Sequence, residues 1–252
     1  MYRLLLLALA GAALPLPAQW FNLPTPGIPR TPDGKPNMSA PAPRKANGQP
    51  DLSGMWQVAG KYLQNIAADL KPGEVPFQPW AEKVFNERRD GSRSKDDPAA
   101  RCLPGMPKAN ALPYPFKIFE TPDTVVILYE GFTTFRQIHT DGRALPKDPQ
   151  PFWMGYSVGK WEGDTLVAET IGMKENTWID NAGHPHSDAL HITERFRRPD
   201  FGHMEIQMTF DDPKTYTKPW TVTEQARAIP DTELLEFVCQ ENEKDYGHLT
   251  GK

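Results

Sequence analysis

The sequence predicts a mainly β fold in which an antiparallel meander closes into a barrel. From residue 124 onward, apolar and polar residues alternate with a period of two, as in strands that have one buried face. Turn-forming segments at 140–143, 162–164 and 199–202 join several of these runs as hairpins. Sheets of eight or nine sequential strands commonly close, because closure removes their exposed edges. The predicted strands are 52–58, 124–130, 132–139, 155–161, 165–171, 190–197, 204–210, 220–226 and 233–239.

The first 18 residues predict a secretory signal peptide. Arg3 supplies a positive charge, Leu4–Leu14 form an apolar run, and Ala18 is a small residue suited to cleavage. The apolar run is shorter than the ~20 residues that cross a bilayer. We therefore expect an exported protein, periplasmic or extracellular, whose mature chain is soluble and has no membrane span.

A Pro-rich segment, residues 19–50, follows the predicted signal peptide and precedes a single barrel domain over 51–252. We expect this segment to be extended or disordered, because its composition supports no core of its own. Two phrases, 33–39 and 47–53, resemble each other. A short helix is predicted over 79–91, a weakly amphipathic region over 62–70, and loops over 92–123.

Charge and motifs exclude several classes of function. The 28 Lys and Arg residues are scattered among 32 Asp and Glu residues, which argues against a nucleic-acid partner. The sequence has no nucleophile elbow, phosphate-binding loop, haem-attachment motif or zinc-binding helix. We therefore predict no cofactor, and any chemistry would use side chains alone or a scavenged metal. The oligomeric state is not indicated.

The two cysteines, Cys102 and Cys239, are either a disulfide or two buried thiols. Export favours the disulfide, because exported proteins fold in an oxidising compartment.

Several phrases resemble known families. Gly54-Met55-Trp56 resembles the Gly-x-Trp signature that opens lipocalin-type (calycin-type) barrels. Longer phrases, at 101–105, 115–118, 155–166 and 183–187, resemble an uncharacterised family of exported proteins from soil bacteria. The resemblance covers about residues 50 to 250 and implies export and one β-rich domain. It implies no catalytic residue.

Three carboxylates share a strand face with apolar residues, and we expect them to face the barrel interior. They are Glu169, Glu194 and Glu224. A carboxylate on an apolar face is costly unless it is paired, hydrogen-bonded or protonated. A polar interior with a general acid or base is one interpretation. The other is that each group caps the barrel or pairs with an arginine such as Arg136.

The loop at 176–189 is the densest polar segment and contains Asp180, His184 and His186. A His-x-His pair can direct two imidazoles to one side, as metal sites and acid–base pairs require. Three interpretations remain open: a metal site at His184 and His186, a metal-free catalytic or ligand site, and surface histidines without a function.

A third polar group, Arg136, Gln137 and His139, lies on one predicted strand, with Arg136 on the opposite face to the other two. Nearby aromatic residues could line an apolar pocket with a few polar groups, as in small-molecule sites, or belong to the core. These aromatic residues are Trp153, Tyr156, Trp161 and Trp178.

Three functional hypotheses follow. The first is a barrel that encloses a small apolar or aromatic molecule and acts on it as an isomerase, lyase or hydrolase. Its acid–base residues would be His184, His186, Asp180, Glu194, His139 and Arg136. Its ligand contacts would be Trp153, Tyr156, Trp178, Glu169 and Glu224. The second is a lipocalin-like carrier without catalysis, and the third is a structural module of the cell envelope.

Overall fold

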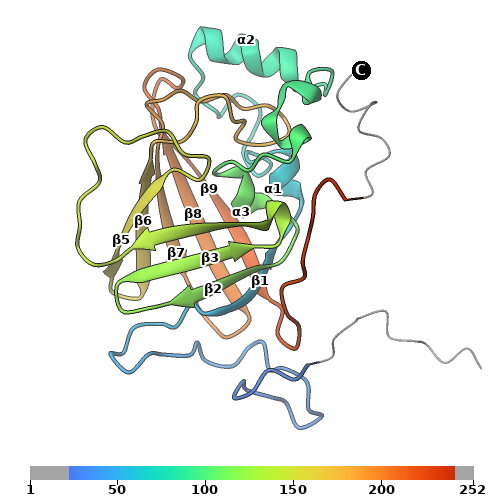
Figure 1. Cartoon of the computed structure of the whole chain (residues 1–252), viewed down its shortest axis with the longest axis vertical. Coiled ribbons are helices and arrows are strands. Elements are labelled where there is room, and N and C mark those ends of the chain that lie inside the picture. The colour runs from blue at the N-terminus through green and yellow to red at the C-terminus, as the bar shows by residue number, and fades with distance from the viewer. Residues whose placement is uncertain (1–22, 242–252) are drawn as a thin grey trace, which may run out of the picture.

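The computed structural model describes residues 23–241, and the predicted signal peptide lies outside the described residues. Nine strands form one closed barrel in chain order, as Figure 1 shows. The strands are β1 (Gly54–Val58), β2 (Phe116–Glu120), β3 (Thr124–Tyr129), β4 (Thr134–His139), β5 (Tyr156–Glu162), β6 (Thr165–Ile171), β7 (His191–Arg197), β8 (His203–Asp211) and β9 (Trp220–Ala228). The predicted mainly β barrel is confirmed.

The barrel is antiparallel except at one seam. Strand β9 pairs with β1 and closes the sheet, and eight of the nine neighbouring pairs are antiparallel. Strands β4 and β5 run parallel and share two register pairs, Ile138 with Ser157 and His139 with Val158. A parallel pair cannot be joined by a tight hairpin. The chain therefore runs through residues 140–155 before β5 begins, and the predicted turn at 140–143 is only the start of this connection.

Two strand assignments from the sequence were wrong. Strand β2 lies in a region that we predicted as loop, because Pro113, Pro115 and Pro122 around it favour a non-strand assignment. Residues 233–239 do not form a strand. Because β9 already pairs with β1, the closed barrel offers this segment no free edge.

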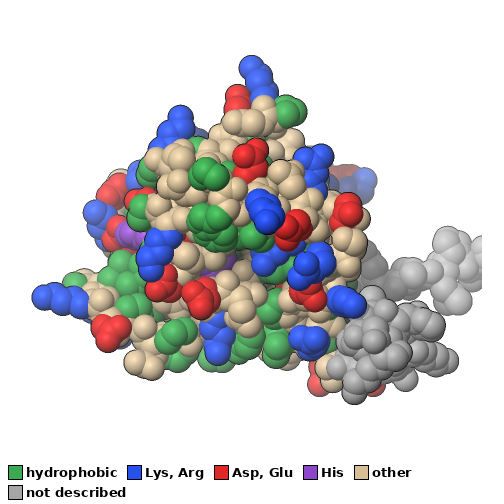
Figure 2. All heavy atoms as spheres, turned by 90° about the horizontal axis from the view of Figure 1, so that it is seen from above, with side chains coloured by type: hydrophobic (Ala, Val, Ile, Leu, Met, Phe, Trp, Pro, Cys, Tyr) green, Lys and Arg blue, Asp and Glu red, His purple; other side chains and the backbone are tan. Residues whose placement is uncertain are grey.

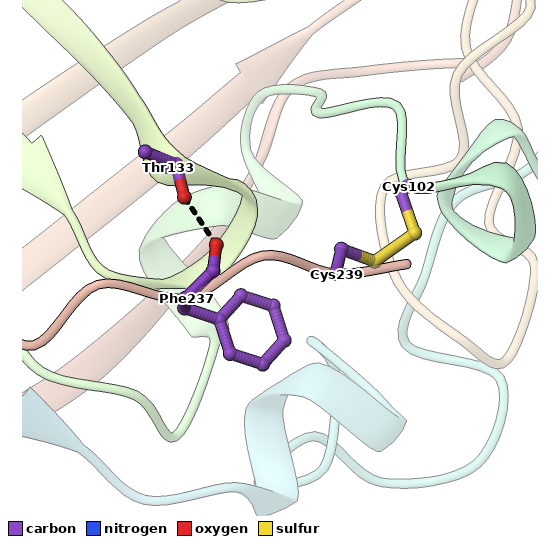
Figure 3. The surroundings of a disulfide bond; sticks show 4 residues. All are labelled: Cys102, Thr133, Phe237 and Cys239. Carbon is purple, nitrogen blue, oxygen red and sulfur yellow. Dashed lines mark hydrogen bonds between the residues drawn. A yellow bond between two sulfur atoms is a disulfide. The ribbon is translucent and has the colours of Figure 1, made fainter. Parts of the chain in front are cut away.

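The segment after β9 is attached to the outside of the barrel instead. In Figure 3, Thr133 Oγ1 donates a hydrogen bond to the carbonyl oxygen of Phe237, beside the Cys102–Cys239 disulfide. The Leu235 amide donates to Glu130 Oε2 at 3.1 Å. The predicted disulfide is thus present, and it joins the connection between β1 and β2 to the segment after β9.

The helices gather at one end of the barrel, the upper end in Figure 1. They are α1 (Lys61–Gln64), α2 (Pro79–Arg88) and α3 (Lys108–Ala111), with 3-10 turns at Ser94–Asp96, Pro98–Arg101 and Gly131–Thr133. Helix α2 begins at Pro79, whose fixed φ suits the first helical position. Within residues 23–241, we find no helix with the length and hydrophobicity needed to cross a membrane.

The described part of the Pro-rich segment, residues 23–50, crosses the opposite end of the barrel (Figure 1) and is not free of structure. Its two similar phrases belong to two similar hairpins. In the first, the amide of Thr31 donates to the Lys35 carbonyl at 2.8 Å; in the second, the amide of Lys45 donates to the Gln49 carbonyl at 2.8 Å. The sequence resemblance therefore marks a repeated local structure.

Each hairpin carries an arginine that binds both its own turn and the barrel domain. Arg30 donates to the Gly34 carbonyl and pairs with Asp231 at 2.6 Å. Arg44 donates to the Gly48 carbonyl and pairs with Asp164 at 2.6 Å. The two ion pairs attach the N-terminal segment to the chain after β9 and to the β5–β6 turn.

The barrel interior is closely packed. In β1, Trp56 is fully buried, and the Arg198 guanidinium lies 4.7 Å from its ring centre. Along the strands, the inward side chains are almost inaccessible to water, and most of them are large and apolar. This density leaves little room for a ligand deep inside the barrel.

Candidate functional site

A charged pair lies inside the barrel. Arg136 of β4 and Glu194 of β7 meet there, with side-chain exposures of 1% and 0%. The guanidinium donates to both carboxylate oxygens: Nη1 to Oε1 at 3.0 Å, and Nη2 to Oε2. Burial opposes the charge on Arg136, but the attraction of Glu194 raises its pKa overall. The predicted inward direction of Glu194 is confirmed, and its partner is Arg136, the arginine named as one that could pair with these carboxylates.

Four neutral side chains complete the hydrogen bonds of this pair. The Arg136 guanidinium also donates to Ser157 Oγ at 3.0 Å and to Thr170 Oγ1 at 2.7 Å. Asn110 donates to Glu194 Oε1 at 2.6 Å, and its own carbonyl accepts from the Tyr129 hydroxyl. The pair is therefore electrically neutral and well supplied with partners, as a buried pair requires.

Glu224 of β9 is a second interior carboxyl and has no such partners. Both of its oxygens are buried and make no hydrogen bond to any described residue. Burial, and to a lesser extent the charge of Glu194, raises the pKa of Glu224 to about 8. The carboxyl is thus protonated at neutral pH.

The third predicted interior carboxylate, Glu169, was assigned to the wrong face. On β6 the inward residues Leu166, Ala168 and Thr170 are buried, while the Glu169 side chain is 44% exposed and lies 3.6 Å from His191. Val167, which set the expected parity, is apolar but lies on the same outer face as Glu169, so the apolar pattern misled the assignment. Glu169 faces away from the polar interior.

A cleft of about 460 Å³ opens where β4 and β5 separate. Only the end of β4 pairs with β5, so Thr134–Gln137 have no strand beside them on that side. Residues 152–155 lie there instead. The Phe152 amide donates to the Gly172 carbonyl at 2.9 Å, and the Met106 amide donates to the Trp153 carbonyl. The parallel seam thus produces the cleft.

The cleft has aromatic walls and a polar floor. Its aromatic residues include Phe135 and Phe152, which are 58% and 52% exposed, together with Trp153 and Tyr156. Arg136 and Ser157, both members of the interior network, also line it. Of the predicted ligand contacts, Trp153 and Tyr156 therefore lie in one cleft with two predicted acid–base residues, Arg136 and His139.

His139 lines this cleft and has one unpartnered polar atom. Its Nδ1 is buried and has no hydrogen-bond partner among the described residues. Its ring lies beside that of Tyr156, with centroids 5.5 Å apart. An unpartnered buried nitrogen costs free energy unless a ligand or a water molecule bonds to it.

Asp180 and His184 form a separate pair near α2. His184 Nδ1 lies 2.7 Å from Asp180 Oδ2, and both side chains are buried. His184 is enclosed by Phe85, Phe77 and Trp220, and none of its contacts involves Glu194. The predicted cluster of His184 with Glu194 is therefore not formed.

His186 belongs to neither group. Its Nε2 lies 2.8 Å from Thr177 Oγ1, and its Nδ1 lies 3.0 Å from the Ser187 carbonyl oxygen. Burial lowers the pKa of His186, so the imidazole is neutral at pH 7. Both histidines are buried, which excludes the interpretation as surface histidines and leaves the other two.

The described residues contain no group of three or more His, Cys, Asp or Glu side chains placed to hold a metal ion. His184 and His186 have different partners, as given above, so the structure offers no support for a shared metal between them.

Trp178, a predicted ligand contact, is almost fully buried outside the cleft. The Arg88 guanidinium lies 4.4 Å and the Lys108 ammonium 5.9 Å from its ring centre. These cation–π contacts give Trp178 a packing role between α2 and α3.

The sequence reasoning missed Asn110, Tyr129, Ser157 and Thr170 of the interior network and Phe135 and Phe152 of the cleft. Thr170 was missed because the parity predicted for β6, with Glu169 inside, places Thr170 outside. No local signal marks Asn110, which reaches Glu194 from α3.

Comparison with known proteins adds little. No protein-family model and no curated protein sequence matches the chain. Among solved structures, the crystal structure of a mutant of the fluorescent protein UnaG is similar, with 16% sequence identity and a TM-score of 0.34. The match covers 72% of this chain and 97% of that chain. At this TM-score the likeness carries no argument about function.

Proposed function

We propose that this protein binds a small, largely apolar molecule with an aromatic ring in the cleft between β4 and β5. The observation that carries the proposal is the unpartnered, buried Nδ1 of His139 in a cleft walled by aromatic side chains. Ligand sites combine apolar walls with a few placed polar groups in this way.

The charge of the site indicates the kind of ligand. The Arg136 charge is balanced by Glu194 through two hydrogen bonds, so the floor presents no net positive charge. A ligand with a carboxylate or phosphate would lose its hydration on entering the cleft, and no unpaired cation would compensate for that loss. We therefore propose a neutral ligand whose polar group bonds to His139 or to the Ser157 hydroxyl.

The proposed site of action is outside the reducing cytoplasm. The Cys102–Cys239 disulfide, which spans 137 residues, and the signal-peptide pattern support this proposal. The resemblance to exported soil-bacterial proteins supports it on the sequence phrases alone. Ligand binding without a reaction is enough to explain the cleft. The proposal therefore includes no acid–base chemistry there.

Fluorescence titration with N-phenyl-1-naphthylamine, a neutral aromatic probe, tests the binding. Phe152→Ala removes an exposed wall of the cleft and should weaken probe binding about tenfold, since an aromatic side chain contributes ~1.5–3 kcal/mol when covered. Phe119→Ala is the matched control, because Phe119 is a similarly exposed phenylalanine on β2 outside the cleft. Equal affinities for the two variants, or no binding by the native protein, would contradict the proposal.

A further inference from the structure

The pocket beneath α2 is distinct from the cleft at the β4–β5 seam. Its volume is about 940 Å³, and it lies between the chain at 64–77, one face of α2, and the loop at 181–184. Figure 2 looks down on this end of the molecule, where basic and acidic side chains are interspersed. His184 forms part of the pocket wall.

The Asp180 carboxylate is fixed by four N–H groups. Oδ1 accepts from the amides of Gly183 at 2.9 Å and His184 at 3.1 Å, and Oδ2 accepts from the Ile66 amide at 2.7 Å. The His184 ring adds the fourth bond, from Nδ1 to Oδ2. Because three backbone N–H groups already donate to it, the carboxylate acts as an acceptor toward the His184 ring.

This arrangement determines the tautomer of His184. Because Nδ1 must donate to Asp180, we assign its hydrogen there, and Nε2 of the neutral ring is a bare acceptor. No described residue makes a hydrogen bond to Nε2. A carboxylate behind an imidazole in this way also stabilises the imidazolium that forms when Nε2 takes a proton.

The loop that holds the dyad is attached to α2. Gly183 has φ of +88°, and a Cβ there would collide with the side chain of Arg88. Arg88 in turn donates to the Gly183 carbonyl at 3.4 Å. The glycine therefore allows α2 to pack directly against the dyad and to roof the pocket.

The pocket lining suits a flat, neutral molecule. Phe77 and Phe85 line it and also flank the His184 ring, with centroids 5.5 and 4.3 Å from that ring. The charged side chains that line it balance in number: Glu82 of α2 and Asp90 are acidic, and Lys71 and Arg89 are basic. A planar ring can thus lie near two phenylalanines without requiring a charge of its own.

We propose that Asp180 and His184 form a general-base dyad that takes a proton from a weakly acidic hydroxyl, a phenol or an enol, of a small planar molecule bound beneath α2. The hydroxyl oxygen keeps the electron pair of its O–H bond, and the proton moves to Nε2. The products of the step are an oxyanion and an imidazolium paired with Asp180, so charge and atoms balance. This proposal is independent of ligand binding at the β4–β5 cleft.

The test uses 4-nitrophenol, whose ionised form absorbs visible light and which titrates near neutral pH. Bound to the native protein just below its solution pKa, it should show more of the phenolate than the free compound does. His184→Gln should abolish this excess and weaken binding about tenfold, the value of a charge-assisted hydrogen bond. Circular dichroism establishes that the variant is folded.

The chain offers a matched control in a second Asp–His pair. His203 Nδ1 lies 2.8 Å from Asp200 Oδ1, but these side chains are 50% and 31% exposed, and neither residue lines the pocket beneath α2. His203→Gln should therefore leave the nitrophenol signal unchanged. Equal loss of signal in both variants would show nonspecific binding and overturn the proposal.

A measurement on the native protein covers the case in which His184→Gln does not fold. Nitrogen-15 NMR of the histidine rings should show His184 with hydrogen on Nδ1, and 4-nitrophenol should convert it to the doubly protonated form. Hydrogen on Nε2 of the free protein, or no change on adding 4-nitrophenol, would overturn the proposal.

Discussion

Arg136 and Glu194 reach each other across the barrel interior from β4 and β7, and each is the other's only charged hydrogen-bond partner among the described residues. Because β4 and β7 are not neighbours in the sheet, the pair links two separated parts of the wall. Its loss therefore affects more than one strand pair.

Replacing one member of this pair should lower the free energy of unfolding far more than replacing both. Arg136→Met leaves the Glu194 charge buried without a cation, which should cost about 3–5 kcal/mol. The double variant Arg136→Met, Glu194→Met should recover most of this loss, because two apolar side chains need no compensation. Urea unfolding at neutral pH measures the three free energies of unfolding. Additive losses in the double variant would contradict the coupling.

The carboxyl of Glu224 should make stability depend on pH. Its pKa is raised from the ordinary 4.5 to about 8, so between these values the folded chain holds a proton that the unfolded chain releases. The stabilisation from this group is fully present below pH 4.5. It falls by about 1.4 kcal/mol per pH unit as the pH rises toward 8, and it is lost above that pH.

Glu224→Gln isolates this contribution, since the amide has a similar shape and cannot ionise. The stability of the variant relative to the native protein should rise steadily from about pH 5 to about pH 8. Urea unfolding at a series of pH values gives this difference and cancels the other titrating groups. A difference that does not vary with pH would mean that Glu224 is not desolvated.

The disulfide should contribute strongly to stability. Closing a loop of 137 residues restricts the unfolded chain, which corresponds to ~4–5 kcal/mol in the chain-entropy model. The variant with Cys102→Ser and Cys239→Ser should therefore unfold at lower denaturant concentration, and reduction of the native protein should reproduce the shift. An unchanged midpoint would show that the segment after β9 is held by its hydrogen bonds alone.

The two N-terminal hairpins should open independently. Asp231→Asn removes the charge that holds Arg30, and Asp164→Asn removes the charge that holds Arg44. We expect faster tryptic cleavage after Arg30 in the first variant and after Lys45 in the second, as followed by mass spectrometry. Simultaneous acceleration at both sites in either variant would show that the hairpins form one unit.

Much of the barrel was predictable from the sequence, because period-two alternation reports directly on burial. The inward direction of Glu194 and Glu224 followed from parity alone. Glu169 was misplaced, because Val167 and Ile171 give the outer face of β6 an apolar sequence pattern. Strand β2 was hidden by the prolines on either side of it.

The site was less predictable, because it depends on pairings between distant segments. Nothing local indicates that β4 and β5 run parallel, and the cleft exists only because they do. Likewise, the partner of His184 was within four residues, but its aromatic neighbours come from α2 and β9. The sequence reasoning named Asp180 and His184 among its acid–base candidates, but it identified neither their pairing nor the pocket beside them.

The β4–β5 seam should also set how fast the barrel interior exchanges protons with its surroundings. Glu224 must gain or lose a proton to follow the bulk pH, although its oxygens have no contact with solvent. The seam has the fewest paired residues of any junction in the barrel, so transient separation there requires the fewest broken interstrand hydrogen bonds. We therefore expect water to enter at the seam, and we expect its opening rate to limit how quickly the interior responds to a pH jump.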